Sequence, residues 1–252
     1  MILFDPNPSL RWLFCLTHPD DEISIGAWIR RLIQSGAQVH LSWTHDNPER
    51  EFEARQAARL LGVPSENLHF HHGPDRVLCD YLLDVLPSFQ AMMNQVQADR
   101  VVAGAFEQGH LDHDATNMLV HRTFQGTILE TPLYHAYCNP IPVMNRFAQP
   151  EGQALCALSP TERAFKVELA KCYPSQAIFG NLVWYRLWES LTGSKERMGE
   201  FESLRVQTHA DFRTPNLPAN LSARVKKTRR WKHWIAAVDR FEASFGPYSA
   251  AG

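Results

Sequence analysis

Short apolar runs and amphipathic stretches alternate along the first half of this chain. Residues 12–17 form a continuous apolar run, as expected of a buried parallel strand, and residues 37–43 alternate between apolar and polar as a second strand would. Residues 68–70 and 100–105 predict a short third strand and a fourth strand. Apolar residues recur at helical spacing between residue 23 and Gly36, and over residues 49–61, 81–96 and 115–124. Further along, a fifth strand is expected at 131–137 and a helix at 161–173. This rhythm predicts an α/β fold with a mainly parallel sheet and helices on both faces.

The C-terminal region departs from the rhythm. A Pro-Asn-Leu-Pro break at residues 215–218 is followed by apolar residues spaced 3, 4, 3 and 4 apart: Trp231, Trp234, Val238, Phe241 and Phe245. Such a narrow stripe is typical of a helix that packs along one seam. We therefore expect an α/β domain over residues 1–200 and, from 201 to 252, a helical C-terminal extension packed on that domain or on a second copy of the chain.

Two clusters of polar residues follow predicted strands. The first is T-H-P-D-D-E at residues 17–22, and the second is E-Q-G-H-L-D-H-D at residues 107–114. Acids at a helix start favour the macrodipole and need no chemical role, but that explanation does not cover His18. An H-x-x-H pair such as His110 and His113 is weak evidence alone. Because both clusters lie at the carboxyl ends of parallel strands, the fold is expected to bring them to one rim.

Together these clusters have the composition of a catalytic zinc site. Two imidazoles and one carboxylate form a common ligand set that leaves a fourth position for water. Asp20 and Asp21 are neighbours, so one carboxylate can bind the metal while the other accepts a proton from the bound water. Zinc lowers the pKa of that water to about 7. The remaining imidazole can stabilise an oxyanion and protonate a leaving amine.

At these residues the sequence resembles the PIG-L/LmbE-like zinc-dependent de-N-acetylases, which include the mycothiol- and bacillithiol-pathway deacetylases. The resemblance covers residues 10–135 and implies a Rossmann-like fold. It also implies that His18, Asp21 and His113 bind Zn²⁺, that Asp20 is the general base, and that His110 is the acid and oxyanion stabiliser. Fe²⁺ or Co²⁺ would suit the same ligands.

The resemblance further implies a substrate class. Arg50 and Asp75 match positions that contact the substrate in family members, and the implied reaction removes an N-acyl group, with acetyl expected, from an N-acetylglucosamine-type sugar or glycoside. Leu111 replaces a proline that many members have, which should matter little because that side chain does no chemistry. Gln108 stands where some members have a tyrosine that assists at the oxyanion.

Two other functions remain open from the residues. One is an amidase that splits a larger conjugate. The other is a non-catalytic Rossmann-like module that binds a nucleotide-sugar, although no G-x-G-x-x-G follows the first strand and the acidic turn would repel phosphate. The three histidines at 69, 71 and 72 resemble a metal cluster, but a solvated strand end is the simpler interpretation of their alternation.

Composition narrows the partners and the compartment. The formal charge is -2, so no global field attracts nucleic acid, and the basic run at residues 224–232 is expected to be a solvated helix face. Five scattered cysteines without a C-x-x-C pair favour a reducing compartment. No basic segment precedes the first apolar run, and no segment reaches the roughly 20 apolar residues of a membrane span. We therefore expect a cytoplasmic protein without a membrane span, and the sequence leaves open whether it is a homo-oligomer.

Overall fold

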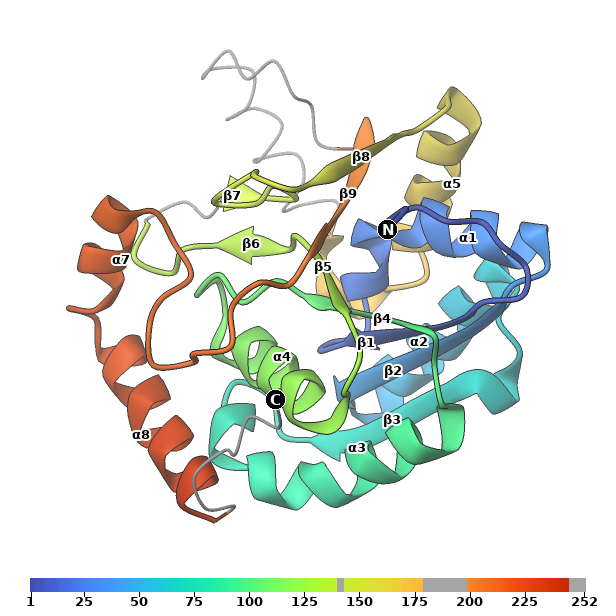
Figure 1. Ribbon diagram of the computed structural model, residues 1–252. Helices are drawn as coiled ribbons and strands as arrows, with labels where there is room; N and C mark the ends of the chain where they lie inside the picture. Colours follow the sequence, from blue (N-terminus) through green and yellow to red (C-terminus); the bar gives the residue numbers. More distant parts are fainter. Residues whose placement is uncertain (140–142, 179–198, 245–252) are drawn as a thin grey trace.

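The computed structural model describes residues 1–139, 143–178 and 199–244, and a seven-stranded sheet forms its centre (Figure 1). The strand order is β3-β2-β1-β4-β5-β9-β8. The strands span Arg11–Leu16 (β1), Gln38–His45 (β2), Leu68–Gly73 (β3), Arg100–Gly104 (β4), Ile128–Thr131 (β5), Ala154–Ala157 (β8) and Phe201–Val206 (β9). β1 to β5 pair in parallel, whereas β9 is antiparallel to both β5 and β8. The predicted α/β fold with a mainly parallel sheet is confirmed.

Helices cover both faces of the sheet. One face packs against α1 (Gly26–Ser35), α2 (Pro48–Leu61) and α5 (Pro160–Ala170). The other packs against α3 (Leu82–Val96), α4 (Leu111–Thr123), α7 (Ala219–Val225) and α8 (Arg229–Ala243). Neighbours along β1 point to opposite faces, so Trp12 and Phe14 belong to one core and Leu13 and Cys15 to the other. Because both faces are covered, the central strands are apolar at successive positions.

The helix ends follow local chemistry. Asn47 caps α2 by accepting the backbone N–H of Arg50 at 2.9 Å, and Gly36 and Gly62 end α1 and α2 in the left-handed region at φ 89°. α4 begins at Leu111, four residues earlier than the sequence predicted. The reason is that His110 caps the helix, since its Nδ1 accepts the backbone N–H of Asp112 at 3.2 Å. Half of the second motif is therefore helical.

The strand predicted at residues 131–137 is wrong. The sheet strand β5 ends at Thr131, and Tyr134–His135 form β6, which pairs with β7 (Val143–Met144) in a separate two-stranded sheet. Pro132 lacks the N–H that a continuing strand would need, so the chain leaves the main sheet there.

The C-terminal helix α8 lies against the sheet domain. Its stripe residues Trp231, Trp234, Val238 and Phe241 are buried in the core that contains α3 and α4, whereas Phe245 lies outside the described residues. β9 extends the main sheet past residue 200, so the segment from 201 begins as a strand, and the proposed division at that residue stays a prediction. Within the described parts of the chain, no helix combines the length and the hydropathy of a membrane-spanning segment.

Candidate metal and catalytic site

The carboxyl ends of β1 and β4 bring the two motifs together. His18 Nδ1 lies 3.2 Å from His113 Nε2, and His113 Nε2 lies 3.4 Å from Asp21 Oδ1. One donor atom from each of His18, Asp21 and His113 lies within 4.8 Å of the others. All three side chains are almost completely buried. The prediction that the motifs share one rim is confirmed.

Backbone hydrogen bonds fix the Asp21 carboxylate. Its Oδ2 accepts the N–H groups of Thr17 at 3.0 Å and His18 at 2.8 Å, which leaves Oδ1 directed at His113. Burial raises the pKa of Asp21, but the adjacent imidazoles of His113 and His18 outweigh it and hold the pKa well below its usual range. Asp21 is therefore an ionised carboxylate with one oxygen available.

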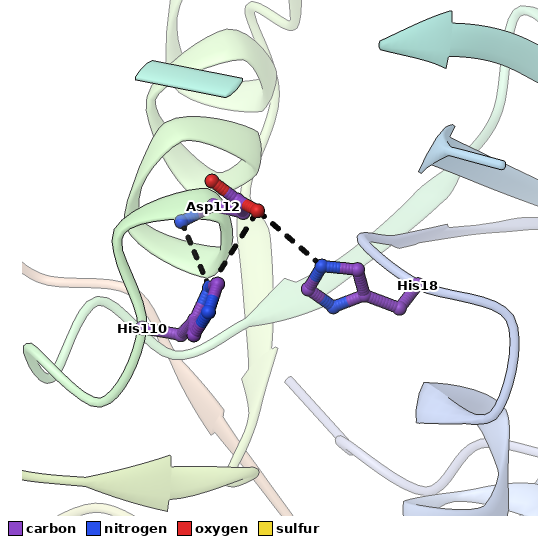
Figure 2. Close-up of side chains that lie close together, drawn as sticks. All are labelled: His18, His110 and Asp112. Carbon is purple, nitrogen blue, oxygen red and sulfur yellow. Dashed lines mark hydrogen bonds and ion pairs between the residues drawn. The ribbon is translucent and has the colours of Figure 1, made fainter. Parts of the chain in front are cut away.

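A second group of potential ligands shares His18 (Figure 2). Asp112 Oδ2 lies 3.5 Å from His18 Nε2 and 3.7 Å from His110 Nδ1. The two carboxylate oxygens of Asp112 already accept the backbone N–H groups of Arg76 at 2.6 Å and Leu78 at 3.0 Å. Asp112 thus joins the loop between β3 and α3 to the site. Sequence reasoning missed this residue, although its position between two candidate histidines was a usable signal.

The donor set fits a divalent metal. Two imidazole nitrogens at 3.2 Å need a proton or a cation between them, and an ionised carboxylate oxygen lies beside them. His18 Nε2 is buried without a hydrogen-bond partner, with carboxylate oxygens of Asp75 and Asp112 each at 3.5 Å. Burial lowers the pKa of His18, but those carboxylates outweigh it and raise the pKa to about 9. One ionised carboxylate and two imidazoles therefore converge on one point, and two further carboxylates lie at the far nitrogen of the His18 ring.

Asp20 is held in an unusual conformation next to these donors. Its φ of 113° lies in the left-handed region, which costs an aspartate of order 1–3 kcal/mol and persists only where the surroundings impose it. Its N–H donates to Glu22 Oε2 at 3.2 Å, and Arg50 donates to Asp20 Oδ1 at 3.0 Å and to the Pro19 carbonyl. Burial and the nearby Asp21 carboxylate raise the pKa of Asp20 to about 8. A carboxylate with this pKa can accept a proton near neutral pH.

Glu22 connects the Asp20 turn to the segment after α5. Its carboxylate is fully buried, and it accepts hydrogen bonds from the Tyr173 hydroxyl and from Trp43 Nε1 at 3.3 Å. Burial raises the pKa of Glu22 to about 7. The sequence interpretation treated the stretch from 171 to 176 as structural, and nothing in the sequence indicated that Tyr173 reaches the motif.

His110 lies at the edge of the pocket with 31% of its side chain exposed. Because Nδ1 accepts the Asp112 N–H, the proton of the neutral ring is on Nε2. Burial, together with His113, lowers the pKa of His110 to about 4. The ring is therefore a neutral donor at pH 7.

Tyr134 completes the wall beside the histidines. Its ring centre lies 4.9 Å from that of His113 and 6.4 Å from that of His110. Gly109 passes so close that a Cβ there would lie 1.7 Å from the Tyr134 carbonyl oxygen, so only glycine fits. Gln108, the residue that replaces a tyrosine of some family members, is fully buried and leaves both side-chain polar atoms without partners among the described residues.

The two expected substrate contacts differ in exposure. Asp75 lies on the rim, with 44% of its side chain exposed and Oδ1 at 3.5 Å from His18 Nε2. Arg50 is almost completely buried and holds the Asp20 turn.

The three histidines of β3 do not share a metal site. His69 faces His40, His71 lies buried between Ser42 and Ser88, and only His72 is largely exposed, next to Asp46. The sequence interpretation as a solvated strand end is therefore wrong for His71, because α3 covers that face of the sheet.

Residues 13–124 match a protein-family model, PIG-L, described as GlcNAc-PI de-N-acetylase. The match includes both motifs and spans less than half of the chain. No curated protein matches.

Several solved structures share the fold. A deacetylase of the teicoplanin biosynthesis pathway, solved as a bog complex, has a TM-score of 0.59 and 18% identity over 80% of this chain and 99% of its own. The zinc-inhibited form of teicoplanin deacetylase Orf2 has a TM-score of 0.57 and 17% identity over 80% and 99%. N,N'-diacetylchitobiose deacetylase from Pyrococcus horikoshii has a TM-score of 0.57 and 16% identity over 80% and 85%. The chain thus shares the fold of these deacetylases, and the matched family segment carries both motifs.

Proposed function

We propose that this protein is a zinc-dependent N-deacetylase that hydrolyses an N-acyl amide, with acetyl as the expected acyl group, on a sugar-like substrate. The observation that carries the proposal is the convergence of His18, Asp21 and His113 beside Asp20, within the segment that matches the PIG-L model. The choice of metal rests on the donor set of two imidazoles and one carboxylate, which suits zinc.

The ligand set we favour is His18 Nδ1, Asp21 Oδ1 and His113 Nε2. Asp112 is the weaker candidate because both of its oxygens already accept backbone N–H groups, whereas Asp21 Oδ1 does not. With the metal on Nδ1, the Nε2–H of His18 would face the carboxylates of Asp112 and Asp75. Metal-binding histidines commonly have such a carboxylate partner on the other ring nitrogen.

Asp20 is the proposed general base. A metal at the three ligands would polarise the amide carbonyl and acidify a bound water. Asp20 is the sequence neighbour of the proposed ligand Asp21 but is not itself a proposed ligand. Its Oδ1 accepts a hydrogen bond from Arg50, and its carboxylate remains available to accept a proton. Its raised pKa also allows it to pass that proton to the departing amine.

His110 is the proposed oxyanion stabiliser. The neutral ring can donate from Nε2 to negative charge that develops on the carbonyl oxygen. Its lowered pKa offers less support for the additional role as a proton donor that the family resemblance implied.

The proposed substrate is an N-acetylated sugar or glycoside. The related proteins are described as deacetylases of teicoplanin biosynthesis and of N,N'-diacetylchitobiose, and the matched model is described as a GlcNAc-PI de-N-acetylase. Asp75 on the exposed rim is the proposed contact for sugar hydroxyls, and Arg50 would act mainly through the Asp20 turn.

A substrate panel tests this function. Zinc-loaded protein would be incubated with N-acetylglucosamine, diacetylchitobiose, a mycothiol- or bacillithiol-type glycoside and a larger amide conjugate, and free amine would be measured. We expect amine release from at least one N-acetyl sugar, and none by Asp20→Asn protein with its zinc retained. Release from the conjugate alone would indicate an amidase, and no release from any compound would contradict the proposal.

A further inference from the structure

A second group of metal-binding residues lies outside the site described above, where the 3-10 helix η3 (Leu78–Asp80) meets α8. Cys79 and Asp80 come from η3 and His233 comes from α8. One donor atom from each residue lies within 4.8 Å of the other two. Residues far apart in the sequence are thus brought together by the packing of α8.

The distances are close to those of a coordination sphere. His233 Nε2 lies 2.8 Å from Asp80 Oδ2 and 4.0 Å from Cys79 Sγ. Zinc bonds of about 2.0–2.3 Å in a tetrahedron place ligand atoms roughly 3.3–3.7 Å apart. The imidazole nitrogen therefore lies about half an ångström too close to the carboxylate oxygen and about half an ångström too far from the sulfur, and side-chain rotation can correct both differences.

We propose that Cys79, Asp80 and His233 bind a second divalent ion of the zinc class, which links α8 to the loop beside the catalytic pocket. A thiolate, an imidazole and a carboxylate suit Zn²⁺ or Co²⁺, and the thiolate disfavours Mg²⁺ and Ca²⁺. The buried thiol forms the inner wall, while the imidazole and the carboxylate are 41% and 29% exposed. An ion can therefore enter from solvent, and water can complete its coordination.

Arg240 supports this arrangement. It donates to Asp80 Oδ1, and His233 Nε2 lies 2.9 Å from Oδ1 and 2.8 Å from Oδ2, so the carboxylate is held between the guanidinium and the imidazole. Metal-binding carboxylates commonly have such a partner. Burial raises the pKa of the Cys79 thiol to about 12, so the thiol is protonated in the metal-free protein. Binding of the ion would release the thiol proton.

The link would act on residues at the catalytic pocket. The loop that enters η3 carries Asp75 on the rim, and the backbone N–H groups of Arg76 and Leu78 bind the carboxylate of Asp112. An ion at η3 would hold α8 against this loop and oppose its local opening. The inference does not depend on the proposed deacetylase activity.

Cobalt provides a direct test, because the catalytic donors include no sulfur. Metal-free protein would be titrated with Co²⁺, and the intense near-ultraviolet thiolate-to-cobalt charge-transfer absorption would be recorded. We expect this band in the wild type, its loss in Cys79→Ser, and its retention in Cys138→Ser, a control at a cysteine outside every candidate group. Absence of the band from the wild type, or its persistence in Cys79→Ser, would overturn the proposal.

Zinc stoichiometry separates this proposal from the catalytic assignment. We expect two zinc ions per wild-type chain, one in Cys79→Ser and one in His113→Ala. His233→Asn, at a half-exposed position, provides a second variant if Cys79→Ser does not fold, and circular dichroism would check each fold. A wild-type protein that binds one zinc, and still binds it in His233→Asn, would overturn the second site. The cobalt band tests only the second site, so it would persist even if the catalytic ligands were wrong.

Discussion

The two proposed metal sites in this chain are built in different ways. His18, Asp21 and His113 lie in the segments that follow the adjacent strands β1 and β4, and Asp21 is held by backbone N–H groups that need no metal. Cys79, Asp80 and His233 join two helical segments, and contacts between side chains bring them together. A preformed site is suited to catalysis because its geometry is set before the substrate binds. A site that joins two elements is suited to stabilising their contact.

The largest expected effect is at the preformed site. His113→Ala removes one of three proposed ligands and should abolish most zinc binding there together with amine release. Zinc would be measured by atomic absorption and turnover by amine production on the same preparation. Full occupancy of the catalytic site in this variant would mean that the ligand set is wrong.

Asp20→Asn should separate catalysis from metal binding. The amide is nearly isosteric but cannot accept the proton, so kcat should fall roughly 10²- to 10⁴-fold while the zinc content stays at the wild-type value. The loss should appear mainly in kcat, because the base acts on charge that develops in the transition state. Turnover near the wild-type rate with zinc bound would exclude Asp20 as the base.

Glu22→Gln should have a smaller effect through positioning. The buried carboxylate accepts the Asp20 N–H and thereby helps to hold its left-handed conformation. Misplacement of a catalytic group by about 1 Å can cost up to about 10²-fold, so we expect a decrease in kcat of roughly 10- to 10²-fold with KM and zinc nearly unchanged. Tyr173→Phe should shift kcat in the same direction, and an unchanged kcat in both variants would show that Glu22 is only structural.

Glu22→Gln should also change how the stability of the protein depends on pH. Burial raises the folded-state pKa of Glu22 from its ordinary value of 4.5 to about 7, so the folded protein binds the proton more tightly than the unfolded chain does. The contribution of Glu22 to stability is therefore fully present below pH 4.5 and is lost as the pH rises to 7. Denaturant unfolding of metal-free protein across this window should show a smaller decline for Glu22→Gln than for the wild type.

The smallest expected effect is at the proposed second metal site, formed by Cys79, Asp80 and His233. Arg240→Gln removes a cation that is 54% exposed from Asp80. Exposed ion pairs contribute about 0.2–1 kcal/mol, so metal-free protein should lose no more than that in its free energy of unfolding. Addition of Zn²⁺ should restore stability less completely than in the wild type, because the carboxylate loses the partner that orients it. An equal zinc-induced shift in melting temperature would show that Arg240 does not orient Asp80.

The sequence identified the fold and the central donors because their signals are local. A continuous apolar run marked β1, alternation marked β2 and an apolar stretch marked β4, and the polar clusters followed β1 and β4 directly. The carboxyl ends of parallel strands share one edge, so the meeting of His18 with His113 could be inferred without coordinates.

The remaining contacts depend on tertiary packing, which leaves no periodic signal. Tyr173 reaches Glu22, a residue 151 positions away, and His233 reaches Asp80, which is 153 positions away. The antiparallel strands β8, at the sheet edge, and β9, between β5 and β8, were also missed, because short strands have weak patterns. Pro132 argued against the strand predicted at 131–137, because proline lacks the N–H that a strand inside a sheet donates. In the structure this effect outweighed the apolar pattern.

Anomalous diffraction from crystals of zinc-loaded protein tests the central assignment most directly. Zinc–nitrogen and zinc–oxygen bonds are about 2.0–2.2 Å, so the expected peak lies at that distance from His18 Nδ1, Asp21 Oδ1 and His113 Nε2. A peak bound instead by His18 Nε2, His110 and Asp112, or no peak between the two motifs, would contradict the account.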